Sequence, residues 1–414
     1  MKYKNKLLFV GGMFPEHQMQ KIIDESKGHI QYAANKLQWN LINGFDSIFD
    51  GEIELLSTPF IGGYPSNYKK LFIQSEYFSH NSTSKDYQAG FFNLRGFKDI
   101  SLYYANKKSI KKWIEKNYDY NLTIVFYSLQ IYYLKLAKWI KENYKNVHLH
   151  VIIPDLPIFM NMQYSNISIH MLIKKYHNYC CNKNILFYDS YTLLTKEMIK
   201  SLNLPSERCV VVEGVFREST CDSINSNKSD NKNKTIVYTG TLTKKYGVMD
   251  LVKAFELIDD ENYELLICGE GEAKLDIEKA AEYDSRILYK GQLSNGEILK
   301  IQRNATLLVN PRKNDIFTKY SFPSKLMEYL GSGVPVLCYK LDGIPKEYDD
   351  YLNYIPNDNL TSFMKKMVCI CNLDPDKLNK IGENGKKFVL ENKTPEKQVE
   401  KIVNCICKNT INKK

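Results

Sequence analysis

Short apolar runs alternate with helix-like segments along the second half of the chain. Between two of these runs, the segment GVMDLVKAFELI repeats its apolar residues at the 3.6-residue period of a helix. Strands that alternate with helices at this spacing predict βαβ units and a parallel sheet. The apolar runs with the length of buried strands are 235–239, 263–268, 286–290, 306–310 and 334–339.

The first half shows the same alternation less regularly. Its candidate strands are 7–10, 122–127, 147–153 and 185–188, and a helix is expected at about 28–43. The sequence therefore predicts an α/β protein with two Rossmann-like parallel-sheet domains. Ligands bind outside the carboxyl ends of the strands in such sheets, so we expect the two domains to face a shared cleft.

The chain is too long for a single hydrophobic core and must contain separate domains, since it has 414 residues. Segment 217–234 is polar, rich in Ser, Asn and Lys, and lacks periodicity, which is typical of a loop or linker. We assign an N-terminal domain to 1–214, a polar loop or linker to 215–234 and a second domain to 235–392. We assign segment 393–414 to a C-terminal helix, and one option is that this helix packs back onto the N-terminal domain.

Positive charge is concentrated in the first half. The net charge is +10, and residues 1–210 contain 26 Lys and Arg against 17 Asp and Glu. Such a domain suits an anionic partner such as a membrane surface, but an organism that favours surface lysine would give the same excess. Segment 103–118 carries five lysines beside Ile110, Trp113 and Ile114. This helix either contacts an anionic membrane or buries an ordinary apolar stripe.

The remaining composition favours a cytoplasmic protein, either free or peripheral on the inner face of the cell membrane. Ten cysteines are scattered without a CxxC pair, as expected for reduced thiols. The N-terminal apolar run is broken by Gly11-Gly12, and segment 122–140 contains Lys135 and Lys138, so no transmembrane segment is expected.

Asp374-Pro-Asp376 matches the metal-binding pattern Asp-x-Asp but better suits a helix N-cap. No metal and no cofactor are expected.

The segment YSFPSKLMEYLGSGVPVL (320–337) is the first candidate for chemistry. Pro323 suits the first turn of a helix, so Ser324 and Lys325 would lie where the helix dipole and open N–H groups attract an anion. Glu328 lies one turn further on the same side, where it can accept hydrogen bonds from a vicinal diol. Phosphate and diol together describe a nucleotide, although a surface helix with a Lys–Glu pair has the same pattern.

Two further segments favour the nucleotide interpretation. In YTGTLTKKYGV (238–248), Gly240 allows close backbone approach, while Thr241, Lys244 and Lys245 supply donors. In NPRKND (310–315), Arg312 follows a strand and can hold a diphosphate with two hydrogen bonds. A loop arginine in a surface ion pair would look the same.

The motif series TIVYTGTL, YGV, LLICGEGE, YKGQL, NPR and YSFPSKLMEYLGSGVPVL resembles the donor-binding domain of glycosyltransferase family 4. The resemblance is strong over 235–345 and weaker in FVGGMFP (9–15) and IIPDLP (152–157). It implies the GT-B fold and a retaining, metal-independent transfer from a nucleotide-sugar donor. The acceptor would be a glycan or lipid-linked glycan in bacterial cell-surface polysaccharide synthesis, such as a capsule or exopolysaccharide, and no nucleic acid is involved.

The resemblance also implies roles for individual residues. Position 320, where the family has the first acid of its Glu-x7-Glu motif, is Tyr320, and the usual Arg at 241 is Thr241. These departures put the donor sugar in doubt, and Arg312 is hypothesised to replace the lost cation. The implied contacts are Glu328 to the ribose; Gly11, Gly12, Gly240, Thr241, Lys245, Ser324 and Lys325 to the diphosphate; and Gly291, Gln292 and Leu293 to the base.

The acceptor side offers Asp155, which follows a candidate strand in IIPDLP and either orients an acceptor hydroxyl or belongs to an ordinary turn. Together with Lys325 and Arg312 it completes the candidate catalytic set. Two other functions remain open. A nucleotide-sugar epimerase shares the fold, and a non-catalytic partner subunit would explain the departures at 241 and 320. The sequence GEGEAK (269–274) has Lys274 at the third glycine of a dinucleotide motif, which disfavours a dehydrogenase.

Overall fold

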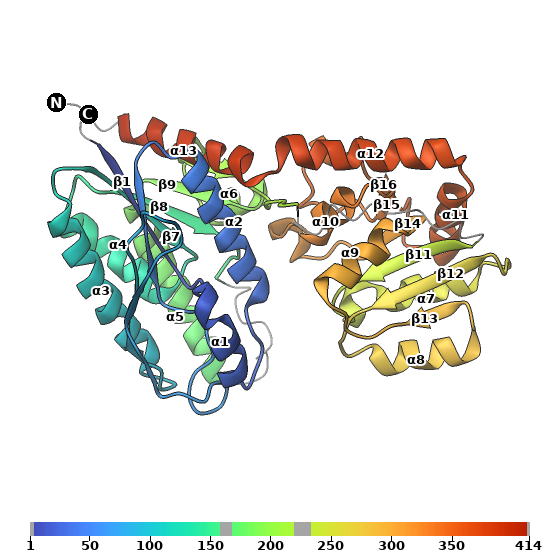
Figure 1. Ribbon diagram of the computed structural model, residues 1–414, viewed down its shortest axis with the longest axis horizontal. Coiled ribbons are helices and arrows are strands. Elements are labelled where there is room, and N and C mark those ends of the chain that lie inside the picture. The colour runs from blue at the N-terminus through green and yellow to red at the C-terminus, as the bar shows by residue number, and fades with distance from the viewer. Residues whose placement is uncertain (1–3, 158–167, 219–232, 412–414) are drawn as a thin grey trace. The chain divides into compact units, whose positions relative to one another are not determined.

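The chain forms two compact α/β units in a computed structural model that describes residues 4–157, 168–218 and 233–411 (Figure 1). Unit 1 contains residues 1–215 together with 395–414, and unit 2 contains residues 216–394. The polypeptide therefore leaves unit 1 near residue 215 and returns to it at Pro395. Most of the polar segment 217–234 lies outside the described residues.

Unit 1 is built on an eight-stranded sheet with the order β10-β9-β8-β7-β1-β2-β5-β4. Neighbouring strands are parallel except β4 and β5, which are antiparallel. The strands β3 (Phe72–Ile73) and β6 (Phe91–Phe92) form a separate antiparallel pair. The strands of the large sheet are β1 (Asn5–Gly11), β2 (Glu52–Ser57), β4 (Glu76–Phe78), β5 (Asp86–Gln88), β7 (Asn121–Tyr127), β8 (His148–Ile153), β9 (Ser190–Leu193) and β10 (Cys209–Val211).

The C-terminal helix α13 (Pro395–Ile411) packs against α2 (Tyr32–Ile48) within unit 1. Gly44 makes this contact possible, since a Cβ there would lie 2.4 Å from the carbonyl oxygen of Pro395. Val399 and Ile402 are fully buried in the same core as Phe45. The other helices of unit 1 are α1 (Met19–Glu25), α3 (Lys98–Lys116), α4 (Ile131–Asn143), α5 (Ser168–Asn184) and α6 (Lys196–Ser201).

Unit 2 contains a six-stranded parallel sheet with the order β13-β12-β11-β14-β15-β16. Its strands are β11 (Lys234–Thr239), β12 (Tyr263–Cys268), β13 (Ile287–Tyr289), β14 (Leu307–Asn310), β15 (Val336–Cys338) and β16 (Asn353–Tyr354). Its helices are α7 (Val248–Glu256), α8 (Lys274–Tyr283), α9 (Asn295–Arg303), α10 (Lys325–Gly331), α11 (Leu360–Cys371) and α12 (Pro375–Asn392).

The strand order of unit 2 reverses between β11 and β14. From β11 the chain proceeds outward to β12 and β13, and then returns to the other side of β11 to form β14, β15 and β16. The carboxyl ends of β11 and β14 therefore flank the switch point, where open parallel sheets bind their ligands. Residues 240–241 and 311–312 follow these two strand ends.

The structure confirms the expected α/β class and most of the predicted strands, but not the strand at 185–188. Residues Ile185–Phe187 form a 3-10 turn, and the backbone N–H of Tyr188 donates to the carbonyl of Ile185. The strand begins instead at Ser190, where it pairs in parallel with β8. Its four residues are all buried, whereas Leu186 is exposed, so burial selects the later segment as the strand.

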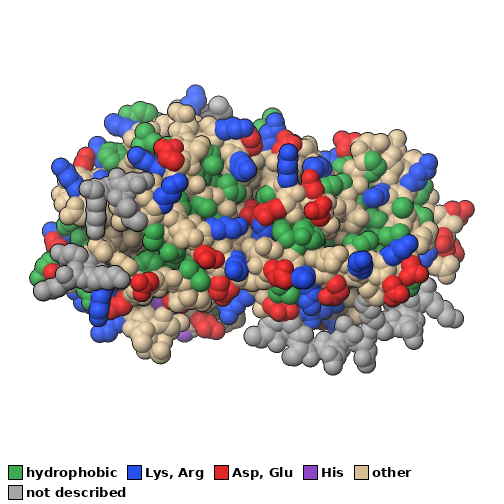
Figure 2. All heavy atoms as spheres, turned by 90° about the horizontal axis from the view of Figure 1, so that it is seen from above, with side chains coloured by type: hydrophobic (Ala, Val, Ile, Leu, Met, Phe, Trp, Pro, Cys, Tyr) green, Lys and Arg blue, Asp and Glu red, His purple; other side chains and the backbone are tan. Residues whose placement is uncertain are grey.

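The lysine-rich segment 103–118 lies largely in α3, and its apolar stripe faces the interior. Ile110, Trp113 and Ile114 are buried in unit 1, which supports the ordinary structural interpretation of that stripe. Figure 2 shows Lys and Arg side chains interspersed with Asp and Glu over the face that it displays. Among the described residues, no helix has the length and apolar character needed to cross a membrane.

Candidate functional site

Glu328 is held by hydrogen bonds from two different helices. Its Oε1 accepts from Lys325 Nζ at 2.7 Å, within α10, and from Gln302 Nε2 at 2.7 Å, from α9. The Glu328 side chain is 27% exposed, so the carboxylate lies at an accessible surface of unit 2. The acid and the lysine of segment 320–337 thus form an ion pair within α10, as an ordinary surface helix with a Lys–Glu pair would also do.

Tyr329 fixes α10 to the end of β11. Its buried hydroxyl accepts from the backbone N–H of Thr239 at 2.9 Å and donates to the carbonyl of Thr239 at 3.0 Å. Thr239 Oγ1 also accepts from Gln302 Nε2 at 2.8 Å. These contacts anchor Glu328 beside the switch point of the sheet.

The turns that follow β11, β12 and β13 are in backbone contact. The N–H of Gly240 donates to the carbonyl of Cys268 at 3.0 Å, and that of Gly269 donates to the carbonyl of Gly291 at 2.8 Å. Gly269 has φ +141°, and a Cβ there would lie 1.8 Å from the carbonyl oxygen of Gly240. Only glycine fits this close approach. The contact leaves Thr241 and Gln292 exposed beyond the strand ends, with Leu293 half-buried.

A second group of charged side chains surrounds the end of β14. The Arg312 guanidinium carbon lies 4.8 Å from the ring centre of Tyr246 and 5.1 Å from that of Phe317. Its Nη2 atom is buried and has no hydrogen-bond partner among the described residues. Lys245 Nζ pairs with Asp315 at 3.0 Å and lies 6.0 Å from the same Phe317 ring. Burial opposes ionisation of Asp315, but hydrogen bonds from Lys245 and the Thr318 backbone, together with the positive charges of Lys245 and Arg312, outweigh it and lower the pKa of the carboxyl.

The structure distinguishes the two lysines of the basic loop. Lys244 Nζ pairs with Asp276 on α8 at 2.7 Å, whereas Lys245 belongs to the group around Arg312. The loop 239–246 connects that group to the one around Glu328. Lys245, Arg312 and Lys325 therefore all lie on the loops and helix that follow the strands flanking the switch point.

The expected contribution of a helix dipole at Ser324 is smaller than predicted. Helix α10 begins at Lys325 rather than at Pro323 and contains seven residues, and Ser324 makes no capping hydrogen bond with its side chain. The aligned peptide dipoles of such a short helix sum to little. An anion bound here would be held mainly by the Lys325 charge and the exposed Ser324 hydroxyl.

The candidates of the first half lie in unit 1, at the carboxyl ends of β1 and β8. Gly12 donates its N–H to Gln38 Oε1 at 2.9 Å, and a Cβ on Gly12 would lie 2.0 Å from the Phe60 ring. Gly11 is buried beside the same glutamine. These glycines are therefore required for local packing, whatever else they do.

Asp155 follows β8, and its own side chain is exposed. The surrounding protein nevertheless desolvates the carboxyl enough to raise its pKa. A carboxyl with a raised pKa is a better proton acceptor than an ordinary aspartate, so the environment of Asp155 suits a base.

His148 and His150 have structural roles in the sheet of unit 1. His150 is fully buried between β8 and β9, where Nδ1 contacts Ser190 Oγ at 2.7 Å and Nε2 contacts Thr192 Oγ1 at 2.8 Å. Its burial lowers the pKa well below the ordinary value. His148 contacts the same serine hydroxyl at 2.9 Å.

Asp374 caps α12, as predicted. Its side chain accepts from the N–H of Asp376 at 3.0 Å, and Pro375 occupies the first turn. In the described part of the chain, no group of three His, Cys, Asp or Glu residues is placed to hold a metal ion.

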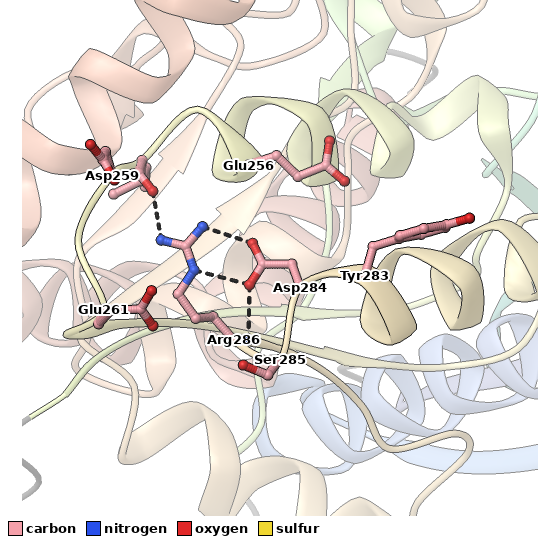
Figure 3. A pocket seen from close by; sticks show the side chains of 8 residues that line it. Glu256, Asp259, Glu261, Tyr283, Asp284, Ser285 and Arg286 are labelled. Carbon is pink, nitrogen blue, oxygen red and sulfur yellow. Dashed lines mark hydrogen bonds and ion pairs between the residues drawn. The ribbon is translucent and has the colours of Figure 1, made fainter.

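A cavity of about 490 Å³ lies at the amino ends of the strands of unit 2, opposite to the candidate site (Figure 3). Segments 258–261 and 284–286 line it and precede β12 and β13, so it opens at the amino ends of the strands. Arg286 occupies its centre and pairs with Asp284 at 2.7 Å. This cavity is separate from the residues around Glu328.

Gln302 and Tyr329 are the site residues that the sequence analysis missed. Tyr329 is buried among the apolar residues of α10, whereas Gln302 is the buried residue of the largely polar helix α9. Nothing in the sequence of segment 295–303 identifies Gln302 as buried or indicates its partners.

The comparisons with known proteins concern the family and the fold of the chain. Residues 221–388 match the family model of glycosyl transferases group 1. No sequence among the curated proteins matches the chain. Many solved structures share its fold.

Three of these structures illustrate the likeness. Sucrose-phosphate synthase from Thermosynechococcus elongatus is 12% identical with a TM-score of 0.62, over 97% of this chain and 98% of that one. The lipopolysaccharide outer core galactosyltransferase WaaB is 14% identical with a TM-score of 0.62, over 97% and 99%. HepE from Anabaena, in complex with UDP, is 11% identical with a TM-score of 0.58, over 97% and 100%. The chain therefore has the predicted GT-B fold with two Rossmann-like domains, and the glycosyl transferases group 1 model matches its residues 221–388.

Proposed function

We propose that this protein is a retaining, metal-independent hexosyltransferase of family 4. It moves a sugar from a nucleotide diphosphate donor to a glycan or lipid-linked acceptor in bacterial cell-surface polysaccharide synthesis. The observation that carries the proposal is the Glu328 carboxylate, anchored beside the β11–β14 switch point, with the cations of Lys325, Lys245 and Arg312 on the neighbouring segments. The Glu328 carboxylate can accept hydrogen bonds from the diol of a ribose, and the three cations can bind a diphosphate. Together these groups match the two parts of a nucleoside diphosphate.

The donor would extend over the carboxyl ends of the strands of unit 2. Glu328 accepts hydrogen bonds from the ribose, and the base meets the turn at 291–293. The diphosphate lies against the Gly240-Thr241 turn, Lys245, Ser324 and Lys325. The resemblance to family 4 assigns Gly11 and Gly12 of unit 1 to the same phosphates.

The positive side chains would promote cleavage of the sugar–phosphate bond. The bond between the anomeric carbon and the diphosphate oxygen breaks, and Arg312, Lys325 and Lys245 stabilise the negative charge on that oxygen. The acceptor hydroxyl forms the new bond on the face that the diphosphate leaves and passes its proton to the departing phosphate or to Asp155. This course retains the anomeric configuration. NMR of the product and activity in excess EDTA test the stereochemistry and the metal independence.

Tyr320 and Thr241 distinguish this site from the family pattern. A phenol at 320 cannot supply the carboxylate that normally contacts the transferred sugar, so the donor sugar is expected to differ in the hydroxyls recognised there. Thr241 removes a cation from the phosphate turn. Arg312, whose Nη2 has no hydrogen-bond partner in the described structure, is proposed to replace it.

The donor site predicts selective stabilisation by one nucleotide. In a thermal-shift panel of UDP, GDP, CMP and dTDP, one member should raise the melting temperature of the native protein. Glu328→Ala should weaken that binding roughly 10- to 100-fold, because a hydrogen-bonded carboxylate is lost. Glu282→Ala, which removes an exposed acid of α8, is the matched control and should respond like the native protein. Failure of every nucleotide to stabilise the native protein would favour the second candidate, a non-catalytic partner subunit, to which the substitutions at 241 and 320 also point.

We further propose that unit 1 contacts an anionic membrane from the cytoplasmic side through the outer face of α3. Ile100 and Tyr104 are exposed on that helix, at four-residue spacing with the exposed Lys108 and Lys112. Exposed lysines beside apolar side chains favour binding at a lipid interface.

Charge removal on α3 tests the membrane proposal. Replacing Lys108, Lys111 and Lys112 together by Ala should lower binding to phosphatidylglycerol-containing vesicles at least about tenfold, since each lysine near the surface contributes about 1 kcal/mol. Sedimentation with vesicles measures the bound fraction. The matched control replaces Lys377, Lys380 and Lys387 on α12, which removes equal charge from unit 2. Equal losses for the two triple variants would show that only net charge matters.

A further inference from the structure

Gln302 is a fully buried amide at the inner end of α9. Its exposed fraction is 0%, and its Nε2 lies 2.7 Å from Glu328 Oε1 and 2.8 Å from Thr239 Oγ1. An amide nitrogen carries two hydrogens, and both are directed to these acceptors. Gln302 therefore connects the carboxylate on α10 to the last residue of β11.

This connection restrains Glu328 more firmly than the contact with Lys325 does. Lys325 belongs to the same short helix, and its side chain is 38% exposed, so it can move with Glu328 or turn toward a bound anion. Gln302 belongs to a different helix, and Thr239 is itself fixed by the hydroxyl of Tyr329. Gln302 thus links the Glu328 carboxylate directly to the strand end at the switch point.

The amide is not accounted for by stability alone. Its Oε1 is buried without a hydrogen-bond partner in the described structure, and a buried acceptor without a partner costs stability. An apolar side chain of the same length would avoid that cost. A half-satisfied amide aimed at the Glu328 carboxylate suggests a role in ligand binding.

We infer that Gln302 is a positioning residue, which orients Glu328 toward the ribose hydroxyls of the donor and so makes the site selective for ribonucleotides. The inference rests on the proposed function, because it requires a nucleotide at Glu328. A carboxylate has lone pairs for about four hydrogen bonds. With Oε1 held by Gln302, the carboxylate is oriented to accept hydrogen bonds from the 2′- and 3′-hydroxyls.

Paired nucleotides provide the test. Isothermal titration calorimetry would compare UDP, GDP and ADP with their 2′-deoxy forms on the full chain. The native protein should prefer the ribose form of the base that it binds. Gln302→Met should weaken that ribonucleotide roughly tenfold, while the affinity for the deoxy form changes less than about twofold, so the preference largely disappears. A purely structural role would weaken both forms alike.

Gln398→Met is the matched control. Gln398 is also fully buried, in α13 of unit 1, and neither of its side-chain amide atoms has a hydrogen-bond partner in the described structure. Its replacement should leave the ribose preference unchanged. If Gln302→Met fails to fold, Gln302→Glu keeps the side-chain volume. Repulsion between its carboxylate and Glu328 should abolish the preference at pH 7.5, and a proton shared by the pair should restore it near pH 5.

The outcomes separate the two claims. An unchanged ribose preference in Gln302→Met or Gln302→Glu, with the preference lost in Glu328→Ala, would overturn the role of Gln302 and leave the proposed function intact. Binding of no nucleoside diphosphate by the native protein would overturn both. Loss of the preference in the Gln302 variants and its retention in Gln398→Met would support the inference.

Discussion

Arg312→Ala is expected to lower kcat/KM for sugar transfer roughly 100- to 1000-fold, the usual effect of removing one preorganised donor from a developing negative charge. The guanidinium is already held in place, because the rings of Tyr246 and Phe317 lie 4.8 and 5.1 Å from its central carbon. Its buried Nη2 has no hydrogen-bond partner in the described structure. Arg312 itself lies two residues after the end of β14, at the switch point. A positive donor that is fixed in advance needs little rearrangement when the diphosphate leaves.

Steady-state kinetics with the nucleotide sugar identified by the panel measures this effect. Lys313→Ala is the matched control, because Lys313 is the next residue but pairs with Asp250 on α7 at 2.9 Å. It should retain activity within about threefold. Arg312→Lys should recover only part of the loss, since an ammonium lacks the planar fork and stacks less well on the rings. Full activity in Arg312→Ala would mean that Lys245 and Lys325 suffice and that the cation missing at 241 is not replaced.

The sequence predicted the architecture well where the signal was local. The run 263–268 became β12 at the same residues, and the helix of segment 247–258 buries Val248 and Leu251 as its period required. A buried strand or helix face is visible in the sequence as a periodic arrangement of apolar residues. The prediction was wrong at 185–188, because a run of four residues is too short to distinguish a strand from a turn.

The candidate site was predictable only in part, for a related reason. Glu328 and Lys325 are three residues apart, so helical spacing alone brings them together. Gln302 reaches Glu328 across 26 residues and Thr239 across 63, and Tyr329 reaches Thr239 across 90. Such contacts depend on the packing of α9 and α10 onto the sheet, which no local pattern specifies.

A charged histidine in unit 1 is another buried polar residue whose partners no local sequence pattern identifies. Its raised pKa predicts how the stability of the protein depends on pH. His80 has an exposed side-chain fraction of 1% and lies between two carboxylates, with Nδ1 2.7 Å from Asp86 Oδ2 and Nε2 3.1 Å from Asp46 Oδ1. Burial disfavours the charged ring, but the hydrogen bonds to Asp46 and Asp86 together with their negative charges outweigh it and raise the pKa of His80 from 6.5 to about 9. The folded state therefore binds this proton more tightly than the unfolded chain.

The contribution of His80 should be complete below pH 6.5 and should disappear as the pH rises to about 9. A shift of this size corresponds to about 3 kcal/mol of unfolding free energy. Urea unfolding at pH 6.5 and pH 9 should show His80→Gln less stable than the native protein by about that amount at the lower pH and by much less at the higher one. The difference between the two proteins is the informative quantity, because Lys98, whose pKa burial lowers to about 8, titrates in the same range in both. A difference that stays constant from pH 6.5 to 9 would mean that the ring is neutral in the folded state, and that Asp46 and Asp86 hold it by hydrogen bonds without its charge.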